Sequence, residues 1–350
     1  MRLQSIDSLR GIAAFGVAVY HLVGFTFFAS PSVILLLPGY GYTGVYLFFV
    51  ISGFCIHLRY AHGREVNWAA FWKRRFVRLY PAYLASLILY VLWSRPEING
   101  FFWYDLFSHL FMFHNLDGRT VYSINGVWWT LAIEEQLYAL YFVLLWMRHN
   151  WGWTWTLAIC LGARFFWLGM SLALHGHHEL PFGEGALANW WTWALGALAV
   201  EAYVGKVKLP NWCYSVAPGL AFLLTAGILD LNKGRISVVF SSLLWGAGFF
   251  FLLNSAVRSN FSWRPLSAIG VFSYSLYLTH EFVISITPAW LAIPLCLAFA
   301  YVFFRLFERP FMRSAALKTL SPTAVEPVQT SNPDVEGMQP LGSKVFLEKE

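Results

Sequence analysis

Hydrophobic residues fill most of this chain in long runs, and short polar segments separate the runs. A helix needs about 17–25 mostly apolar residues to cross a bilayer. Ten stretches approach or reach this length, at residues 8–28, 40–61, 80–94, 126–147, 153–174, 186–204, 211–230, 236–254, 266–287 and 289–308. The pattern predicts an all-α, polytopic membrane protein with about ten transmembrane helices.

Segment 101–116 is also apolar, but it carries the ionisable residues Asp105, His109 and His114. We therefore expect an interfacial or re-entrant helix there instead of a further span. From about residue 320 the chain is rich in Pro, Ser, Gly and acidic residues and lacks hydrophobic periodicity, which is typical of disorder. The predicted organisation is a membrane-embedded domain over residues 1–312 followed by a disordered cytoplasmic tail over residues 313–350.

The basic residues predict the orientation of the helices. If the N-terminus is cytoplasmic, fifteen Lys and Arg residues fall in cytoplasmic segments and only four fall in the opposite loops. Cytoplasmic loops of membrane proteins carry this excess of positive charge. We therefore expect both termini in the cytoplasm. The expected location is the inner (plasma) membrane.

Composition excludes an ordinary soluble domain, because 58% of the residues are hydrophobic and only 12% are charged, about half the usual share. The net charge of +6 follows from the topology, so we expect membrane lipids as partners and no nucleic acid. The four cysteines lie singly in or beside apolar stretches and fit small buried hydrophobes. The His-rich run at residues 175–179 has no second ligand set, so we predict no metal site.

Arg10 and His21 lie in the first apolar stretch, eleven residues apart. This spacing is close to three helical turns, so both side chains project from one face, with His21 roughly 16 Å deeper than Arg10. Ionisable residues inside a membrane segment are costly and usually functional. The pair indicates a membrane-embedded base beneath an anion-facing arginine. The alternative is an arginine that reaches the headgroups and a hydrogen-bonded core histidine.

The segment Lys73 to Pro81, KRRFVRLYP, concentrates positive charge before the third stretch. Arginine binds phosphate through two parallel hydrogen bonds, so Arg74, Arg75 and Arg78 are candidates for a phosphate clamp. A basic patch on anionic lipid is the alternative.

Two further helices carry polar groups at mid-depth. Glu134 and Glu135 lie in an apolar helix, and we place Glu134 at the depth of His21, where it would orient or charge the imidazole. Glu135 then needs another partner, such as Arg164. His280 lies at a similar depth, and Tyr274 adds a hydroxyl on the same helix. The alternative for the glutamates is a structural pair between helices, and the alternative for His280 and Tyr274 is a polar contact that holds two helices together.

The chain resembles the acyltransferase-3 family of membrane proteins through six motifs in order. These are IDSLRGIAAFGVAVYHL, VYLFFVISGFCI, RRFVRLYPAYL, WWTLAIEEQLY, IGVFSYSLYLTHE and FERP, within about residues 5–312. The family's Arg-x10-His pattern falls on Arg10 and His21, and its arginine element falls on Arg74, Arg75 and Arg78. Its tryptophan-to-glutamate motif falls on Trp129 and Glu134, and its F-F-x-x-S-G element includes Ser52.

The resemblance implies an enzyme that moves an acyl group, usually acetyl, from cytoplasmic acyl-CoA to a hydroxyl of an extracytoplasmic or lipid-linked carbohydrate such as O-antigen, exopolysaccharide or peptidoglycan. His21 would be the base, Glu134 would orient it, and Arg10 would hold the donor's anionic end. The arginine triad would bind acetyl-CoA, and Trp129, Ser52, Tyr274 and His280 would contact substrate. We expect a stand-alone form without an extracytoplasmic esterase-like domain. A transporter or flippase for a lipid-linked glycan or small metabolite is the competing interpretation.

Overall fold

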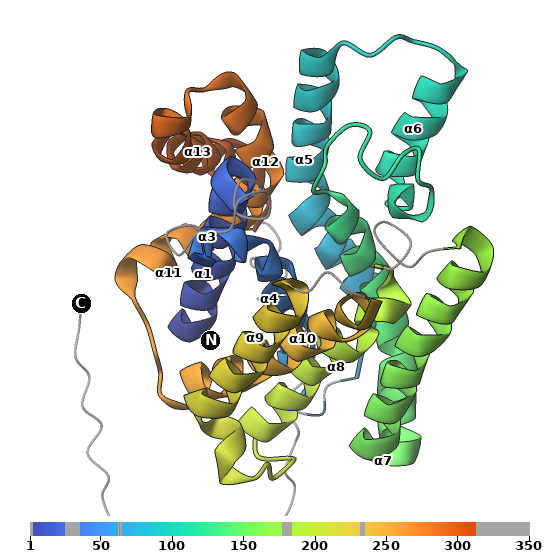
Figure 1. Cartoon of the computed structure of the whole chain (residues 1–350), viewed down its shortest axis with the longest axis vertical. Coiled ribbons are helices and arrows are strands. Elements are labelled where there is room, and N and C mark those ends of the chain that lie inside the picture. The colour runs from blue at the N-terminus through green and yellow to red at the C-terminus, as the bar shows by residue number, and fades with distance from the viewer. Residues whose placement is uncertain are drawn as a thin grey trace, which may run out of the picture.

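The computed structural model describes residues 3–24, 36–61, 63, 65–176, 184–231 and 235–312, so the predicted tail over residues 313–350 lies outside the described residues. All regular elements in these ranges are helices, which confirms the predicted all-α class (Figure 1). The α-helices are α1 (Gln4–Val19), α3 (Leu36–Gly39), α4 (Gly44–Leu58), α5 (Trp68–Ser94), α6 (Gly100–Leu110), α7 (Trp129–His175), α8 (Ala186–Tyr203), α9 (Val216–Leu231), α10 (Arg235–Arg258), α11 (Arg264–Val271), α12 (Ser273–Ile286) and α13 (Ala289–Phe303). Short 3₁₀ segments are η2 (Gly41–Thr43), η3 (His114–Leu116) and η4 (Asn211–Tyr214), and π-helical turns are η1 (Tyr20–Gly24) and η5 (Phe304–Glu308).

The number of span-length helices is smaller than the ten predicted. Within the described residues, six helices are long and apolar enough to cross a membrane, or seven if the bent pair α11 and α12 forms one span. The predicted spans at residues 126–147 and 153–174 correspond to the two halves of α7, which a kink at Gly152 (φ 73°) separates and which this count includes as one helix. The 16 residues of α9 make it shorter than a standard span. The structure therefore shows a multi-pass bundle and leaves the count of ten as a prediction.

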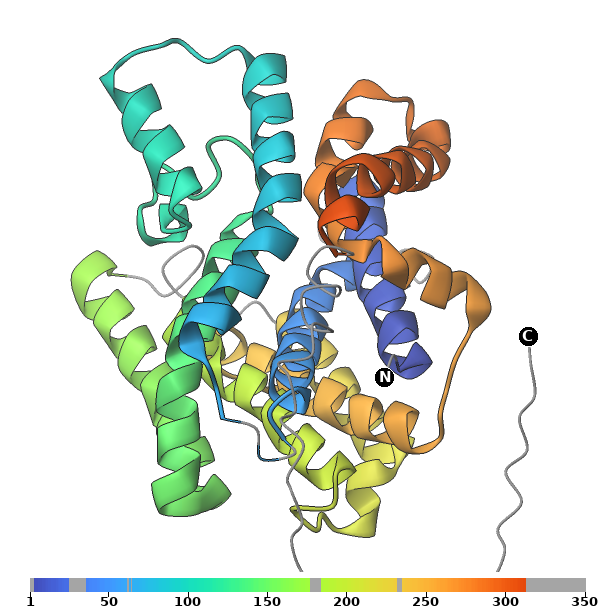
Figure 2. The same cartoon turned by 180° about the vertical axis from the view of Figure 1, so that it is seen from behind.

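Helices α1 and α4 lie in the middle of the bundle. They contact each other, α1 also contacts α11 and α12, and α4 also contacts α8 and α10. In Figures 1 and 2 this places α11 to α13 on one flank and α8 to α10 at one end, with α5, α6 and α7 on the opposite flank. Residues from both ends of the chain therefore meet at the centre.

Glycines let the central helices approach closely. A Cβ on Gly53 of α4 would lie 2.0 Å from the Trp193 carbonyl oxygen of α8, and a Cβ on Gly196 of α8 would lie 2.0 Å from the Val50 carbonyl oxygen of α4. Small residues allow this backbone contact between membrane helices. Gly53 follows Ser52 in the F-F-x-x-S-G element, so the motif fixes the position of that serine against α8.

Helix α5 begins earlier than predicted. The Asn67 side chain accepts a hydrogen bond from the Ala70 amide at 2.9 Å, which caps the helix start, and the helix continues through Pro81. The arginine cluster therefore belongs to the first turns of a 27-residue helix instead of preceding the span at residues 80–94.

Helix α6 accounts for the apolar segment 101–116. It has only 11 residues, about 16 Å of helix, so it is too short to span a bilayer. Its buried residues are Asp105, Ser108 and His109, and its exposed residues include Phe101, Trp103 and Phe107. This amphipathic pattern fits the predicted interfacial helix.

Candidate functional site

A cavity of about 840 Å³ lies between α1, α4, α5, α7, α12 and η5. Its lining includes the predicted residues Arg10, Ser52, Arg74, Arg75, Arg78, Glu134 and Tyr274. We call it the arginine cavity. It also reaches Leu3, Arg59 and Met312, near the start of α1, the end of α4 and the end of η5. Residues far apart in sequence thus line one space at that end of the bundle.

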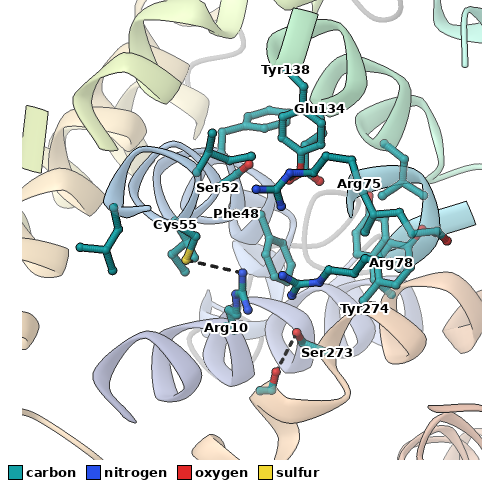
Figure 3. Close-up of a pocket in the computed structure, with 18 of the residues that line it drawn as sticks. Arg10, Phe48, Ser52, Cys55, Arg75, Arg78, Glu134, Tyr138, Ser273 and Tyr274 are labelled. Carbon is teal, nitrogen blue, oxygen red and sulfur yellow. Dashed lines mark hydrogen bonds between the residues drawn. The ribbon is translucent and has the colours of Figure 1, made fainter. Parts of the chain in front are cut away.

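Guanidinium groups from two helices converge in the arginine cavity. Figure 3 shows Arg10 on α1 and Arg75 and Arg78 on α5 pointing into the same space. The Arg10 Nη2 donates to Cys55 Sγ at 3.6 Å, and the Arg74 Nη2 donates to the Tyr60 hydroxyl at 2.7 Å. These contacts orient the arginines without neutralising their charge.

Arg75 is held by aromatic rings. Its guanidinium carbon lies 5.5 Å from the Phe71 ring centroid and 5.3 Å from the Tyr138 ring centroid. Its Nε is buried and has no hydrogen-bond partner within the described residues. A stacked guanidinium with an unused donor is prepared to bind an anion.

The arginine cavity carries more positive than negative charge. Its lining contains Glu134 and Glu308, but neither lies within 4 Å of Arg10, Arg74, Arg75 or Arg78 as an ion pair in the described part of the chain. Glu134 accepts a hydrogen bond from Tyr138, and Glu308 Oε2 accepts one from Ser275 Oγ at 2.7 Å. Burying cations without partners is costly, so the arrangement favours an anionic ligand.

The predicted substrate-contacting residues separate into two groups. Ser52 and Tyr274 line the cavity: Ser52 Oγ accepts from Trp193 Nε1 at 3.2 Å, and the Tyr274 hydroxyl donates to the Leu79 carbonyl at 3.2 Å. Trp129 and His280 are not among the lining residues. Trp129 packs partly buried against the hydrophobic core.

His21 and His280 form a histidine pair beyond the cavity. His280 Nδ1 lies 3.1 Å from the Leu276 carbonyl and 2.9 Å from the Tyr277 carbonyl, so this nitrogen must carry a proton. In the neutral ring, Nε2 is then an acceptor, and it lies 3.3 Å from His21 Nδ1. His21 Nδ1 also lies 2.9 Å from the Val17 carbonyl, so His21 Nδ1 is the donor. The lone pair of neutral His21 is therefore on Nε2, which suits this atom to act as a base.

The structure gives His21 a different carboxylate neighbour from the one we predicted. Its Nε2 lies 3.9 Å from Glu281 Oε1, and Glu281 Oε2 accepts from the Gly126 amide at 3.0 Å. Glu134 instead lines the arginine cavity. The predicted pairing of His21 with Glu134 is replaced because α12, after its 80° bend from α11, brings Glu281 and His280 to His21.

The suggested pairing of Glu135 with Arg164 is also wrong. Arg164 is buried and donates from Nη1 to the Ala188 carbonyl at 3.0 Å and from Nη2 to the Val239 carbonyl at 3.0 Å. Arg164 thus joins α7 to α8 and α10. Glu135 Oε1 is buried and has no hydrogen-bond partner within the described residues.

Tyr277 connects the arginine cavity to the histidine pair. Tyr277 lines the cavity together with Thr130, and their hydroxyls are hydrogen-bonded to each other. Its ring centroid lies 5.8 Å from that of His280, which lies 5.0 Å from that of His21. The cavity therefore ends two side chains away from His21.

Sequence reasoning missed Glu281 and Glu308, and it noted Tyr277 only as one of several hydroxyls on the helix of His280. Both glutamates stand in the quoted motifs, and a buried carboxylate in an apolar helix was the available signal. His21 and Glu308 also lie in the π-helical turns η1 and η5. Such turns often occur at functional sites, but apolar periodicity does not reveal them.

No metal centre is found in the part of the chain that the structure describes: it holds no group of three or more His, Cys, Asp or Glu side chains that could bind an ion. Residues 177–179 of the His-rich run lie outside the described residues.

The fold and the site together define a multi-pass membrane protein whose helical bundle encloses an arginine-lined cavity leading to a buried histidine pair. Residues 3–308 match the family model described as an acyltransferase domain, so the chain belongs to the acyltransferase-3 family. This match confirms the resemblance carried by the six motifs.

Among named relatives, the O-acetyltransferase OatA of Staphylococcus aureus (strain NCTC 8325 / PS 47) is 27% identical over 79% of this chain and 50% of its own length. The peptidoglycan O-acetyltransferase OatA of Listeria monocytogenes serovar 1/2a is 25% identical over 83% of this chain and 51% of its own length. The chain thus spans about half the length of these relatives. No solved structure matches it.

Proposed function

We propose that this protein is an acyl-CoA-dependent O-acyltransferase, most simply an O-acetyltransferase, of the inner (plasma) membrane. It would move the acyl group to a hydroxyl of an extracytoplasmic or lipid-linked carbohydrate. The observation that carries the proposal is the arginine cavity. Its residues Arg10, Arg74, Arg75 and Arg78 form no ion pair with a carboxylate within 4 Å in the described residues, and its inner end approaches the histidine pair. Family membership and the names of the relatives support it.

The donor would be acetyl-CoA in the arginine cavity. Coenzyme A carries phosphate groups at one end and the acyl thioester at the other, so its charge suits Arg74, Arg75 and Arg78 and its apolar arm suits the inner wall. Arg10 would hold the donor's anionic end near Cys55. The basic residues at this end of the bundle support a cytoplasmic opening, with both termini on that side and about ten passages through the membrane.

The reaction would be a direct transfer with His21 as general base. The acceptor hydroxyl loses its proton to His21 Nε2 as its oxygen attacks the thioester carbonyl. The new C–O bond forms, the C–S bond breaks, and the CoA sulfur leaves and takes up a proton. His280 holds the His21 tautomer through the 3.3 Å contact, and Glu281, 3.9 Å away, stabilises the imidazolium. Glu134 would act within the cavity instead of on His21.

The acceptor would reach His21 from the side opposite the arginines. The relative from Listeria is named for peptidoglycan, which makes cell-wall glycan one acceptor class for this chain, beside O-antigen and exopolysaccharide. Ser52, Trp129, Tyr274 and His280 would position the two substrates.

The test is transfer in sealed proteoliposomes that hold the full-length protein and a lipid-linked or soluble glycan. Acetyl-CoA carrying a label in the acetyl group is supplied on one side. We expect labelled glycan ester and stoichiometric free CoA thiol. Movement of unmodified glycan or of intact labelled acetyl-CoA across the membrane, with no glycan ester formed, would instead identify a transporter or flippase.

A further inference from the structure

A second cavity of about 710 Å³ lies beside the arginine cavity, where α8, η4 and the end of α10 meet. Helices α8 and α10 are labelled in the lower part of Figure 1. Tyr203, the last residue of α8, lines both cavities. Phe54 of α4 lines only the second, and its ring centroid is 6.1 Å from that of Tyr203. The two cavities therefore share one aromatic wall.

The second cavity is basic. Lys208 and Arg258 line it, and its lining contains no acidic residue. Neither cation forms an ion pair with a carboxylate within 4 Å in the described ranges. The Arg258 guanidinium carbon lies 4.6 Å from the Tyr214 ring centroid, so an aromatic face orients the charge.

The backbone around these cations is fixed. Helix α10 ends with Asn260 at φ 51° and with the Phe261 amide bonded to the Ala256 carbonyl at 2.9 Å, which closes the last turn that carries Arg258. Beyond α8, the Lys206 amide bonds to the Glu201 carbonyl at 2.8 Å. The second cavity is therefore built from anchored ends of two helices.

Amide side chains complete the lining. Asn211, Asn254 and Asn260 border the second cavity together with Tyr214. The Asn254 Nδ2 donates to the Phe250 carbonyl at 2.9 Å, which directs its oxygen to serve as an acceptor. Asparagine side chains match the hydrogen-bonding edge of adenine, and a tyrosine ring offers a stacking surface for a base.

We propose that the second cavity binds the adenine nucleotide end of the acyl-CoA donor, with Arg258 and Lys208 on its 3′-phosphate and Tyr214 and the asparagines on its adenine. This inference rests on the proposed function and assigns the donor to two connected cavities. The arginine cavity takes the pyrophosphate and the pantetheine arm. The CoA molecule passes from one cavity to the other beside Tyr203, which lines both. A phosphate group is also present in anionic lipid headgroups, so the test must separate the two sources.

The experiment measures equilibrium binding of three probes to the full-length protein in phosphatidylcholine nanodiscs: CoA, 3′-dephospho-CoA and 4′-phosphopantetheine. We expect Arg258→Ala with Lys208→Ala to weaken CoA binding by about 10- to 100-fold, the loss of a charge-assisted hydrogen bond. The same variant should change binding of 3′-dephospho-CoA by less than about threefold and leave 4′-phosphopantetheine unaffected. Tyr214→Ala should weaken both nucleotides and spare 4′-phosphopantetheine.

Lys206→Ala is the matched control, because Lys206 is an exposed cation on the same loop outside both linings. An equal loss for all three probes, or no loss for CoA, would overturn the assignment. The assignment would also be overturned if the wild-type protein bound phosphatidylglycerol, and the double variant lost that binding but still bound CoA more tightly than 3′-dephospho-CoA. That result would identify a lipid site. If CoA binds and only Arg78→Ala weakens it, this inference alone fails; if wild type binds no CoA, the proposed donor fails as well.

Discussion

Replacement of Glu281 by glutamine tests which carboxylate serves His21. The change removes the charge 3.9 Å from His21 Nε2 while keeping an oxygen that can accept from the Gly126 amide. Two unit charges at this separation interact by about 1 kcal/mol in water and about 4 kcal/mol at an effective dielectric constant of 20. The side chains of His21 and Glu281 are 16% and 26% exposed, so we expect an intermediate loss of about 2 kcal/mol.

A loss of about 2 kcal/mol in transition-state stabilisation corresponds to a roughly 30-fold lower kcat. The assay is acetyl transfer from acetyl-CoA at saturating donor, followed by CoA thiol release. The KM for acetyl-CoA should stay near the wild-type value, because Glu281 is absent from the lining of the arginine cavity. Glu134→Gln is the comparison, and it should act mainly on donor KM. A wild-type kcat in Glu281→Gln together with a large kcat loss in Glu134→Gln would refute this assignment and restore the pairing predicted from the sequence.

Three further changes follow from the structure. Arg78→Lys keeps the charge but loses the planar fork, so the KM for acetyl-CoA should rise by about 10-fold or more at normal protein abundance; an unchanged KM would argue against phosphate binding. Gly53→Ala should lower the thermal unfolding temperature in detergent, because its Cβ would lie 2.0 Å from the Trp193 carbonyl oxygen, and unaltered stability would contradict the close packing of α4 and α8. Burial and the stacked His109 lower the pKa of His114 to about 3, below the ordinary value of about 6.5, so opening of residues 111–125 takes up a proton below pH 6.5. The free energy of opening, measured by hydrogen exchange corrected for its intrinsic rate, should therefore fall by up to about 2 kcal/mol between pH 7 and pH 5. An opening free energy that does not change with pH would contradict the buried neutral ring.

The helices were predictable because long apolar runs require a nonpolar environment whatever the tertiary fold. Every predicted stretch is helical over most of its described residues. The residues at which the helices begin and end were not predictable from hydrophobicity alone. The Asn67 cap extends α5 over a basic segment that apolar counting excludes.

The arginine side of the site was predictable because charge in an apolar chain is rare. Arg10, Arg74, Arg75 and Arg78 all line one cavity, as their positions at one end of two predicted spans suggested. The partner of His21 was not predictable by depth. Counting residues assumes straight helices, whereas His21 lies in a π-helical turn and α12 follows a sharp bend.

The most direct test of the central claim is acetyl transfer by His21→Ala at matched membrane abundance. His149→Ala is the control, since His149 is an exposed histidine of α7 outside both cavities. If His21 Nε2 is the base, transfer to glycan should fall by about 10²–10⁴-fold in His21→Ala, while CoA binding and helix content stay near wild type. Near-normal transfer by His21→Ala would contradict the claim and move the base to another group beside the histidine pair.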